Sequence, residues 1–97
     1  YTVECNDIPM MIVQHHEAAY WTQKCIDCFD RLHKEGAGRP KIMAIAIHPY
    51  ISGQPFRIKY LERVYEHIAK AKGVVHWNGE QILEWYLKAR GGAKSPP

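Results

Sequence analysis

The sequence predicts an α/β protein built from about three β/α units with parallel strands. Short apolar runs alternate with longer segments in which apolar residues recur every three or four positions. The central run, residues 42–47, is apolar without alternation, which is typical of a strand covered on both faces in a parallel sheet. The order strand, helix, strand, helix, strand, helix, with mostly short connections, favours right-handed βαβ units.

The first expected strand is TVEC, residues 2–5, followed by a break at Asn6 and Asp7. The run MMIV, residues 10–13, is compatible with a second short strand or with an apolar loop. The first helix is expected from Glu17 to Glu35, because its apolar residues form one continuous stripe and glycines follow it. The residues of that stripe are Ala18, Trp21, Cys25, Cys28, Phe29 and Leu32.

The second expected strand, within KIMAIAIH, delivers His48 at its carboxyl end. Pro55 is well placed to open the second helix, which Gly73 ends. The third strand is expected at residues 74–77, VVHW. Asn78 followed three residues later by Gln81 resembles a capping box that opens the third helix. Residues 1–90 are therefore expected to form one domain, and residues 91–97 a flexible tail.

Composition excludes several classes of function. The chain has 97 residues and a formal charge of +3, without a basic run that could follow a phosphate backbone, so no nucleic-acid partner is expected. No apolar stretch is long enough to span a bilayer, and the first residues do not resemble a signal peptide, so no membrane partner is expected. Three cysteines cannot all pair within the chain, which favours a reducing compartment and predicts a cytoplasmic location.

His48 is the first candidate for chemistry. Pro49 restricts the preceding residue to an extended conformation, so the histidine is held at a defined exit from its strand. The carboxyl ends of strands are where α/β folds gather chemistry, and an imidazole there can act as general acid or base near neutral pH. The alternative is a histidine that bonds a loop carbonyl. Asp7, with Asn6, either binds substrate or orients a catalytic group, or belongs to an ordinary turn.

Other motifs carry weaker signals. Arg57 could clamp an acidic or carbonyl group, although a solvated arginine is the alternative. The C-x-x-C pair CIDC, residues 25–28, lies inside the stripe of the first helix and is expected to face the core. The adjacent histidines of QHHE, residues 14–17, usually point in different directions. No metal site of familiar type is expected from these residues.

The segment IAIHPYISGQPFRIKYLERVYEHI, preceded by VECNDIPMM and FDRLHKEGAGRPKIMAIAI, closely resembles the C-terminal part of the polysaccharide deacetylase (NodB-homology, carbohydrate esterase family four) family. The branch that it resembles most contains peptidoglycan deacetylase-like proteins and cofactor-independent allantoinases. The resemblance runs from about Tyr1 to Leu87, and HPYISGQPFR is its most specific part.

The resemblance implies a segment of a distorted (β/α) barrel that hydrolyses amide bonds, in N-acetyl sugars or in cyclic amides. It implies that His48 is the general acid that protonates the leaving amine, and that Asp7 is an acidic residue near the rim of the active site. Tyr50, Gly53 and Arg57 would belong to the loop that shapes the substrate pocket. The family's Asp-Asp pair and paired metal-binding histidines have no counterpart here, so a divalent, zinc-like metal is expected only for the complete domain.

Two functions follow. In the first, the chain is the C-terminal portion of a metal-dependent amidohydrolase that acts on a small amide or amino-sugar substrate, and it carries the acid without the base or the metal. In the second, it is a non-catalytic binding or assembly domain derived from such an enzyme. In both, the chain alone is expected to be inactive. About three strands leave open sheet edges, which predicts a homo-oligomer or coverage by a missing N-terminal half.

Overall fold

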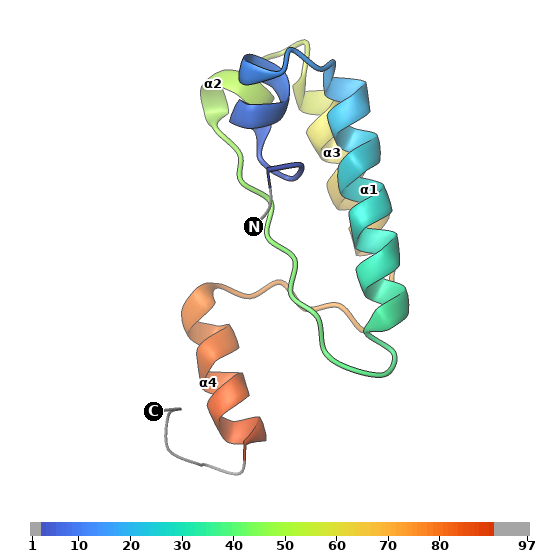
Figure 1. The fold of residues 1–97 in the computed structure, drawn as a ribbon, viewed down its shortest axis with the longest axis vertical. Helices are drawn as coiled ribbons and strands as arrows, with labels where there is room; N and C mark the ends of the chain where they lie inside the picture. The colour runs from blue at the N-terminus through green and yellow to red at the C-terminus, as the bar shows by residue number, and fades with distance from the viewer. Residues whose placement is uncertain (1–2, 91–97) are drawn as a thin grey trace.

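The structure is a computed structural model, and it describes residues 3–90. The flexible tail expected at residues 91–97 therefore lies outside the described residues. The described part consists of helices joined by turns and extended segments (Figure 1). In chain order the elements are the π-helix η1 (Ile8–Val13), α1 (Ala18–Glu35), α2 (Pro49–Ser52), α3 (Ile58–Ala69) and α4 (Gly79–Ala89).

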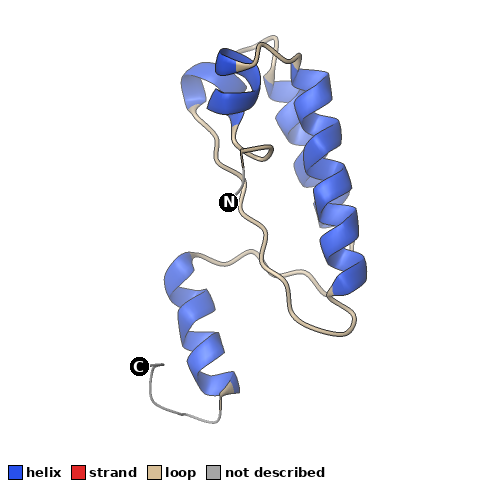
Figure 2. Cartoon of the chain, in the orientation of Figure 1, coloured by secondary structure: helices blue, strands red, loops and turns tan. Residues whose placement is uncertain are grey.

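The predicted α/β fold with parallel strands is wrong for residues 3–90, where no strand is present (Figure 2). Within residues 3–90, one isolated parallel bridge joins Asn6, just after the first expected strand, to Ala46 in the second. The extended segments that contain residues 42–47 and 74–77 have no adjacent strands, so side chains such as Ile42 and Val75 stay mostly exposed. A strand needs a neighbour to satisfy its backbone and bury its faces, and an apolar run alone does not provide one.

The run MMIV is neither a strand nor a loop. It forms the last four of the six residues of η1, with Met10 and Met11 buried and Ile12 exposed. A helical turn puts the two methionines on the core side at once, whereas a strand would point neighbouring residues to opposite faces. The residues MMIV therefore form a helical turn with one buried and one exposed side.

Helices α1 and α3 lie side by side and run in the same direction (Figure 1). The Thr22 hydroxyl donates to the Tyr60 carbonyl at 3.0 Å, near the start of both helices. Towards their ends, His67 Nε2 lies 2.6 Å from Asp30 Oδ1. The extended segment after α1 returns along the pair and brings the chain to α2 at the end where both helices begin.

The core lies between α1 and α3 and beneath η1 and α2. The apolar stripe predicted for the first helix is confirmed, since Trp21, Cys25 and Phe29 are buried, and so is the expectation that Cys25 faces the core. Each large apolar side chain buried in this way contributes roughly 1.5–3 kcal/mol. The other buried apolar residues are Cys5, Met10, Met11, Ala18, Ile51, Leu61, Val64 and Ile68.

Helix α4 is held by local interactions. The predicted capping box is confirmed, because the Asn78 side chain accepts from the Gln81 backbone N–H and the Gln81 side chain accepts from the Asn78 backbone N–H. None of the residues of α4 is buried, and Leu83 and Trp85 are largely exposed. α4 therefore adds little to the core.

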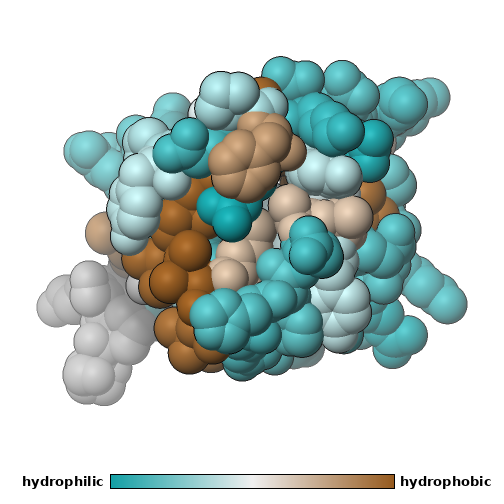
Figure 3. Space-filling view, turned by 90° about the horizontal axis from the view of Figure 1, so that it is seen from above, coloured by the Kyte–Doolittle hydropathy of each residue, from teal (hydrophilic) through white to brown (hydrophobic). Residues whose placement is uncertain are grey.

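Figure 3 views the molecule from the end where α1 and α3 begin. Apolar side chains gather on one side of this end, and hydrophilic side chains surround them. Within residues 3–90, none of the helices has the length and apolar character needed to cross a membrane. The cytoplasmic location stays a prediction.

Candidate functional site

Two distant parts of the chain meet at the bridge between Asn6 and Ala46. The Asp7 backbone N–H donates to the Ala46 carbonyl at 3.1 Å, and the Ala46 N–H donates to the Cys5 carbonyl at 3.0 Å. Asp7 follows one residue after Asn6, and His48 follows two residues after Ala46. The bridge therefore places the side chains of these two predicted site residues next to each other.

His48 occupies the position expected from the proline after it. Its backbone is extended, with φ −129° and ψ 130°, and Pro49 is the first residue of α2. The His48 carbonyl accepts from the N–H groups of Ile51 and Ser52 at 2.9 and 3.0 Å. One short helical turn thus fixes the histidine at the end of its extended segment.

Asp7 is fully buried and accepts three hydrogen bonds. Its Oδ1 lies 2.8 Å from His48 Nδ1, and its Oδ2 accepts from the His48 backbone N–H at 2.7 Å. The Ser52 hydroxyl donates to the same Oδ2 at 2.8 Å. Both oxygens are therefore engaged by polar groups of the chain, which offset the cost of burying the carboxyl group.

This arrangement fixes the orientation and the tautomer of His48. A carboxylate accepts only, so the hydrogen between the two side chains belongs to Nδ1. The other ring nitrogen, Nε2, is then the one available to a reacting molecule. The side chain is 38% exposed, and the Tyr50 ring stands edge-on beside it with 6.0 Å between centroids. His48 is therefore anchored on one side and open on the other.

Ser52 was not singled out by its sequence pattern. Its hydroxyl is buried against Asp7, 45 residues away in the chain. A helix placed from Pro49 onward would have put Ser52 one turn after His48, but no sequence motif indicates that a serine there contacts an aspartate. The pairing depends on the bridge between the two segments, which is a property of the tertiary structure.

The three other predicted site residues have different surroundings. Tyr50 is exposed beside His48, whereas Gly53 ends α2 and has a structural role. A Cβ atom at Gly53 would lie 2.5 Å from the Pro49 carbonyl oxygen, so a larger residue would disrupt the turn. Arg57 immediately precedes α3, stacks its guanidinium over the Phe56 ring at 4.8 Å, and donates weakly to the Ile51 carbonyl at 3.5 Å.

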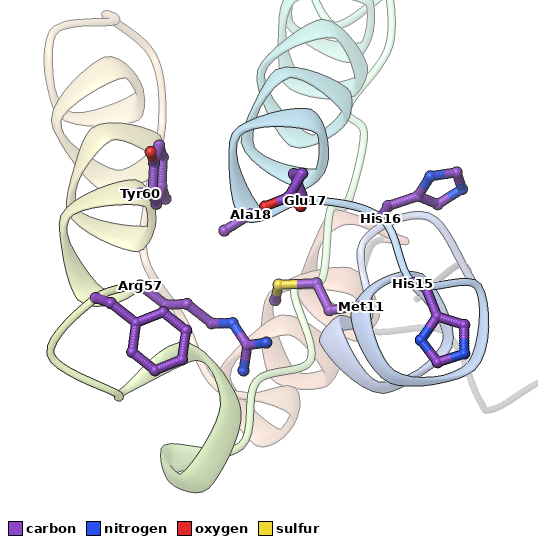
Figure 4. Close-up of a pocket in the computed structure, with 8 residues that line it drawn as sticks. Met11, His15, His16, Glu17, Ala18, Arg57 and Tyr60 are labelled. Atoms are coloured by element: carbon purple, nitrogen blue, oxygen red, sulfur yellow. The ribbon is translucent and has the colours of Figure 1, made fainter.

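Arg57 also lines a cavity of about 340 Å³ between η1, the start of α1 and the start of α3 (Figure 4). In Figure 4 the Arg57 guanidinium and the Met11 side chain extend towards each other across this space, and the rings of His15 and His16 lie beyond Met11. The lining residues are Met11, His15, His16, Glu17, Ala18, Phe56, Arg57 and Tyr60.

The described residues do not fit a metal centre. Among residues 3–90 there is no group of three or more His, Cys, Asp or Glu side chains placed to hold a metal ion. In the QHHE segment, His16 bonds the Gln14 side chain at 3.1 Å and stacks on Tyr20. Asp7 already receives three donors, so its oxygens are engaged within the protein.

Cys5 and Cys25 are buried and Cys28 is partly buried, and the surroundings of Cys25 and Cys28 favour the neutral thiol. Burial raises the pKa of the Cys25 thiol strongly, and the neighbouring Cys5 raises it further by repulsion and by hydrogen bonding. Burial and Cys5 also raise the pKa of Cys28. Thiolate is the reactive form, so the side chains of Cys25 and Cys28 are structural in character.

Comparison with known proteins finds a relative that matches most of this chain. The chain is 35% identical over 92 residues to a protein of the fission yeast Schizosaccharomyces pombe (strain 972 / ATCC 24843) that is named "Putative polysaccharide deacetylase". The match covers 91% of this chain and 28% of the yeast protein, so the chain spans little more than a quarter of that relative. No family model matches the chain. No solved structure matches it either.

Proposed function

We propose that this chain supplies the general-acid side of a polysaccharide deacetylase-type site that hydrolyses non-peptide C–N bonds. The observation that carries the proposal is the bond between buried Asp7 and half-exposed His48, which leaves Nε2 available. Similarity to the yeast protein supports the deacetylase character. The assignment to the allantoinase-containing branch stays part of the proposal.

The chemistry assigned to His48 is one proton transfer. In its protonated form, His48 holds one hydrogen on Nδ1 towards Asp7 and one on Nε2 towards the substrate. As the C–N bond of the amide intermediate breaks, the Nε2 proton moves to the leaving nitrogen, and the neutral imidazole remains bound to Asp7. Asp7 stabilises the charged ring and keeps it oriented, which is a positioning role.

The proposal assigns only the general acid to this chain. It does not assign the catalytic base or the metal that a complete deacetylase site would contain. The described residues contain no cluster of three or more His, Cys, Asp or Glu side chains that could hold a metal ion. No step of the proposal therefore uses a metal bound to this chain. A divalent, zinc-like metal in a complete domain would activate water and polarise the amide carbonyl. We assign those parts to a further segment of the natural protein or to an associated chain.

A non-catalytic binding or assembly domain is the second candidate. The observation that favours it is the exposure of apolar side chains along the extended segments and α4, where Ile42 is 67%, Val75 64% and Leu83 55% exposed. Apolar side chains exposed in this way are available to contact a partner. A homo-oligomer or an N-terminal segment would each cover it.

The test is amide hydrolysis by the natural gene product that contains these residues, measured on an N-acetylated oligosaccharide. His48→Gln is expected to lower kcat by about 10²- to 10⁴-fold with bound metal unchanged by elemental analysis. His76→Gln, which alters an exposed histidine elsewhere, serves as the control. The 97-residue chain alone, with zinc added, is expected to be inactive.

Equal activity of the His48→Gln and His76→Gln variants would exclude the general-acid role. Full activity of the 97-residue chain alone would contradict the division of the site between this chain and another segment. If neither protein hydrolyses amides, while the chain self-associates through its apolar segments, the assembly function replaces the enzymatic one.

A further inference from the structure

We infer that Ser52 is a positioning residue of the general-acid site, and that its hydroxyl holds the Asp7 carboxylate in the orientation that directs Oδ1 at His48. The inference rests on the proposed function of His48 and deepens it. Its starting point is a buried polar side chain that the proton transfer itself does not use. Ser52 is 2% exposed, and its hydroxyl donates to Asp7 Oδ2 at 2.8 Å.

A closed ring of hydrogen bonds joins Ser52, Asp7 and His48. The Ser52 backbone N–H donates to the His48 carbonyl at 3.0 Å, across the single turn of α2. The Ser52 hydroxyl donates to Asp7 Oδ2, and the same oxygen accepts from the His48 backbone N–H at 2.7 Å. Ser52 thus fixes the carboxylate relative to the backbone from which the imidazole extends.

The two carboxylate oxygens of Asp7 have separate partners. Oδ2 receives the Ser52 hydroxyl and the His48 backbone N–H, whereas Oδ1 lies 2.8 Å from His48 Nδ1. The terminal torsion of an aspartate side chain is broad, so a carboxylate rotates easily unless its partners restrict it. Without the hydroxyl, one donor remains on Oδ2, and Oδ1 is directed less firmly at Nδ1. Asp7 is 0% exposed, so bulk water does not replace the lost donor.

The position of Ser52 separates catalysis from substrate binding. The hydroxyl is buried, whereas the His48 side chain is 38% exposed, so a substrate meets the ring and not the serine. Loss of the hydroxyl is therefore expected to lower kcat and to leave KM unchanged. Misplacement of a reacting group by about 1 Å costs up to about 10²-fold in rate, and a loosened imidazole is expected to cost about tenfold.

The experiment compares Ser52→Thr with Ser52→Val. These two side chains have nearly the same shape, and only threonine keeps the hydroxyl, so the added bulk affects both variants alike. In the intact 97-residue chain, the His48 Nδ1–H proton is expected to exchange with solvent at least about tenfold faster in Ser52→Val, as measured by NMR. In the natural gene product, Ser52→Val is expected to lower kcat about tenfold on the N-acetylated oligosaccharide at unchanged KM. Ser52→Thr is expected to restore both values.

Thr22→Val is the matched control. Thr22 is 5% exposed, and its hydroxyl donates to the Tyr60 carbonyl at 3.0 Å. This variant removes a buried hydroxyl donor of the same kind, so it is expected to lower the unfolding midpoint while the Nδ1–H exchange rate and kcat stay unchanged. Equal values in Ser52→Val and Ser52→Thr, or equal losses in Thr22→Val, would overturn the inference.

The exchange measurement separates this inference from the proposed function. If His48→Gln keeps full activity, the general-acid role fails, but faster Nδ1–H exchange in Ser52→Val alone still supports the positioning role. If His48→Gln loses activity while exchange in Ser52→Val is unchanged, the general-acid role holds and the positioning role is overturned. Ser52→Ala adds no atoms, and it provides the same comparison with the unaltered chain if the larger side chains prevent folding.

Discussion

His48 Nδ1 lies 2.8 Å from Asp7 Oδ1, although 41 positions separate the two residues in the chain. The carboxylate reaches the ring and the backbone of the same histidine, since its second oxygen accepts from the His48 N–H at 2.7 Å. A single buried side chain thus fixes both the ring and the main chain of His48. Substitution of Asp7 should affect local structure and chemistry together.

Asp7→Asn is expected to lower the free energy of unfolding by about 3 kcal/mol, because the amide has one accepting oxygen and cannot accept from all three donors around the buried Asp7 side chain. Urea denaturation measures this change. The proton NMR resonance of the hydrogen-bonded Nδ1–H of His48 is also expected to be lost. Asp27→Asn alters an exposed carboxylate that accepts from Gln23, and it is expected to change stability by less than about 0.5 kcal/mol. Equal losses in the two variants would contradict the anchoring role of Asp7.

Gly53→Ala is expected to destabilise the chain by about 1–3 kcal/mol. The new methyl group would meet the Pro49 carbonyl oxygen at 2.5 Å, and the backbone of α2 would have to move. Thermal or urea denaturation detects the change, and Gly38→Ala is the matched control because no atom lies within 4 Å of its added Cβ. A neutral Gly53→Ala variant would show that α2 tolerates rearrangement.

Stability is expected to fall as pH rises above about 8.5, where an ordinary thiol ionises. Burial and Cys5 raise the pKa of Cys25 in the folded chain, so the unfolded chain releases its proton first. The unfolded state then binds fewer protons than the folded state, and the free energy of unfolding decreases with pH. Urea denaturation at several pH values measures this slope. Cys25→Ala should make it shallower, and an unchanged slope would exclude Cys25 as its source.

Asn78→Ala is expected to weaken α4 by about 1 kcal/mol, because it removes the side-chain acceptor of the capping box. Amide hydrogen exchange should speed up within residues 79–89. The global unfolding midpoint should stay unchanged, since α4 contributes no buried residues. Asn78→Ser preserves a capping oxygen and should retain most of the protection. A large shift of the global midpoint would show that α4 is coupled to the core.

The helices could be predicted from sequence because their signals are local. The stripe on α1 and the capping box of α4 each depend on residues a few positions apart, and both are present as expected. The strands were wrong because an apolar run such as residues 42–47 becomes a strand only beside another strand. The sequence contains the run but does not determine its neighbour.

The candidate site was predictable only in part. Pro49 correctly indicated that His48 is extended, because the constraint acts between adjacent residues. Asp7 was identified as a candidate, but the local pattern could not distinguish its contact with His48 from an ordinary turn. Ser52 was missed because its partner lies on a distant segment. Contacts of this kind follow from how the segments pack.

The bridge between Asn6 and Ala46 also links the candidate site to the order of folding. The two segments that it joins enclose all of α1, so their ends meet only after a long loop has closed. Closing such a loop costs entropy that the helix alone cannot offset, and contacts so distant in sequence tend to form late. A chain with α1 already helical would still lack the bond between Asp7 and His48. We therefore expect partly folded molecules in which this loop has not closed to carry an unanchored histidine.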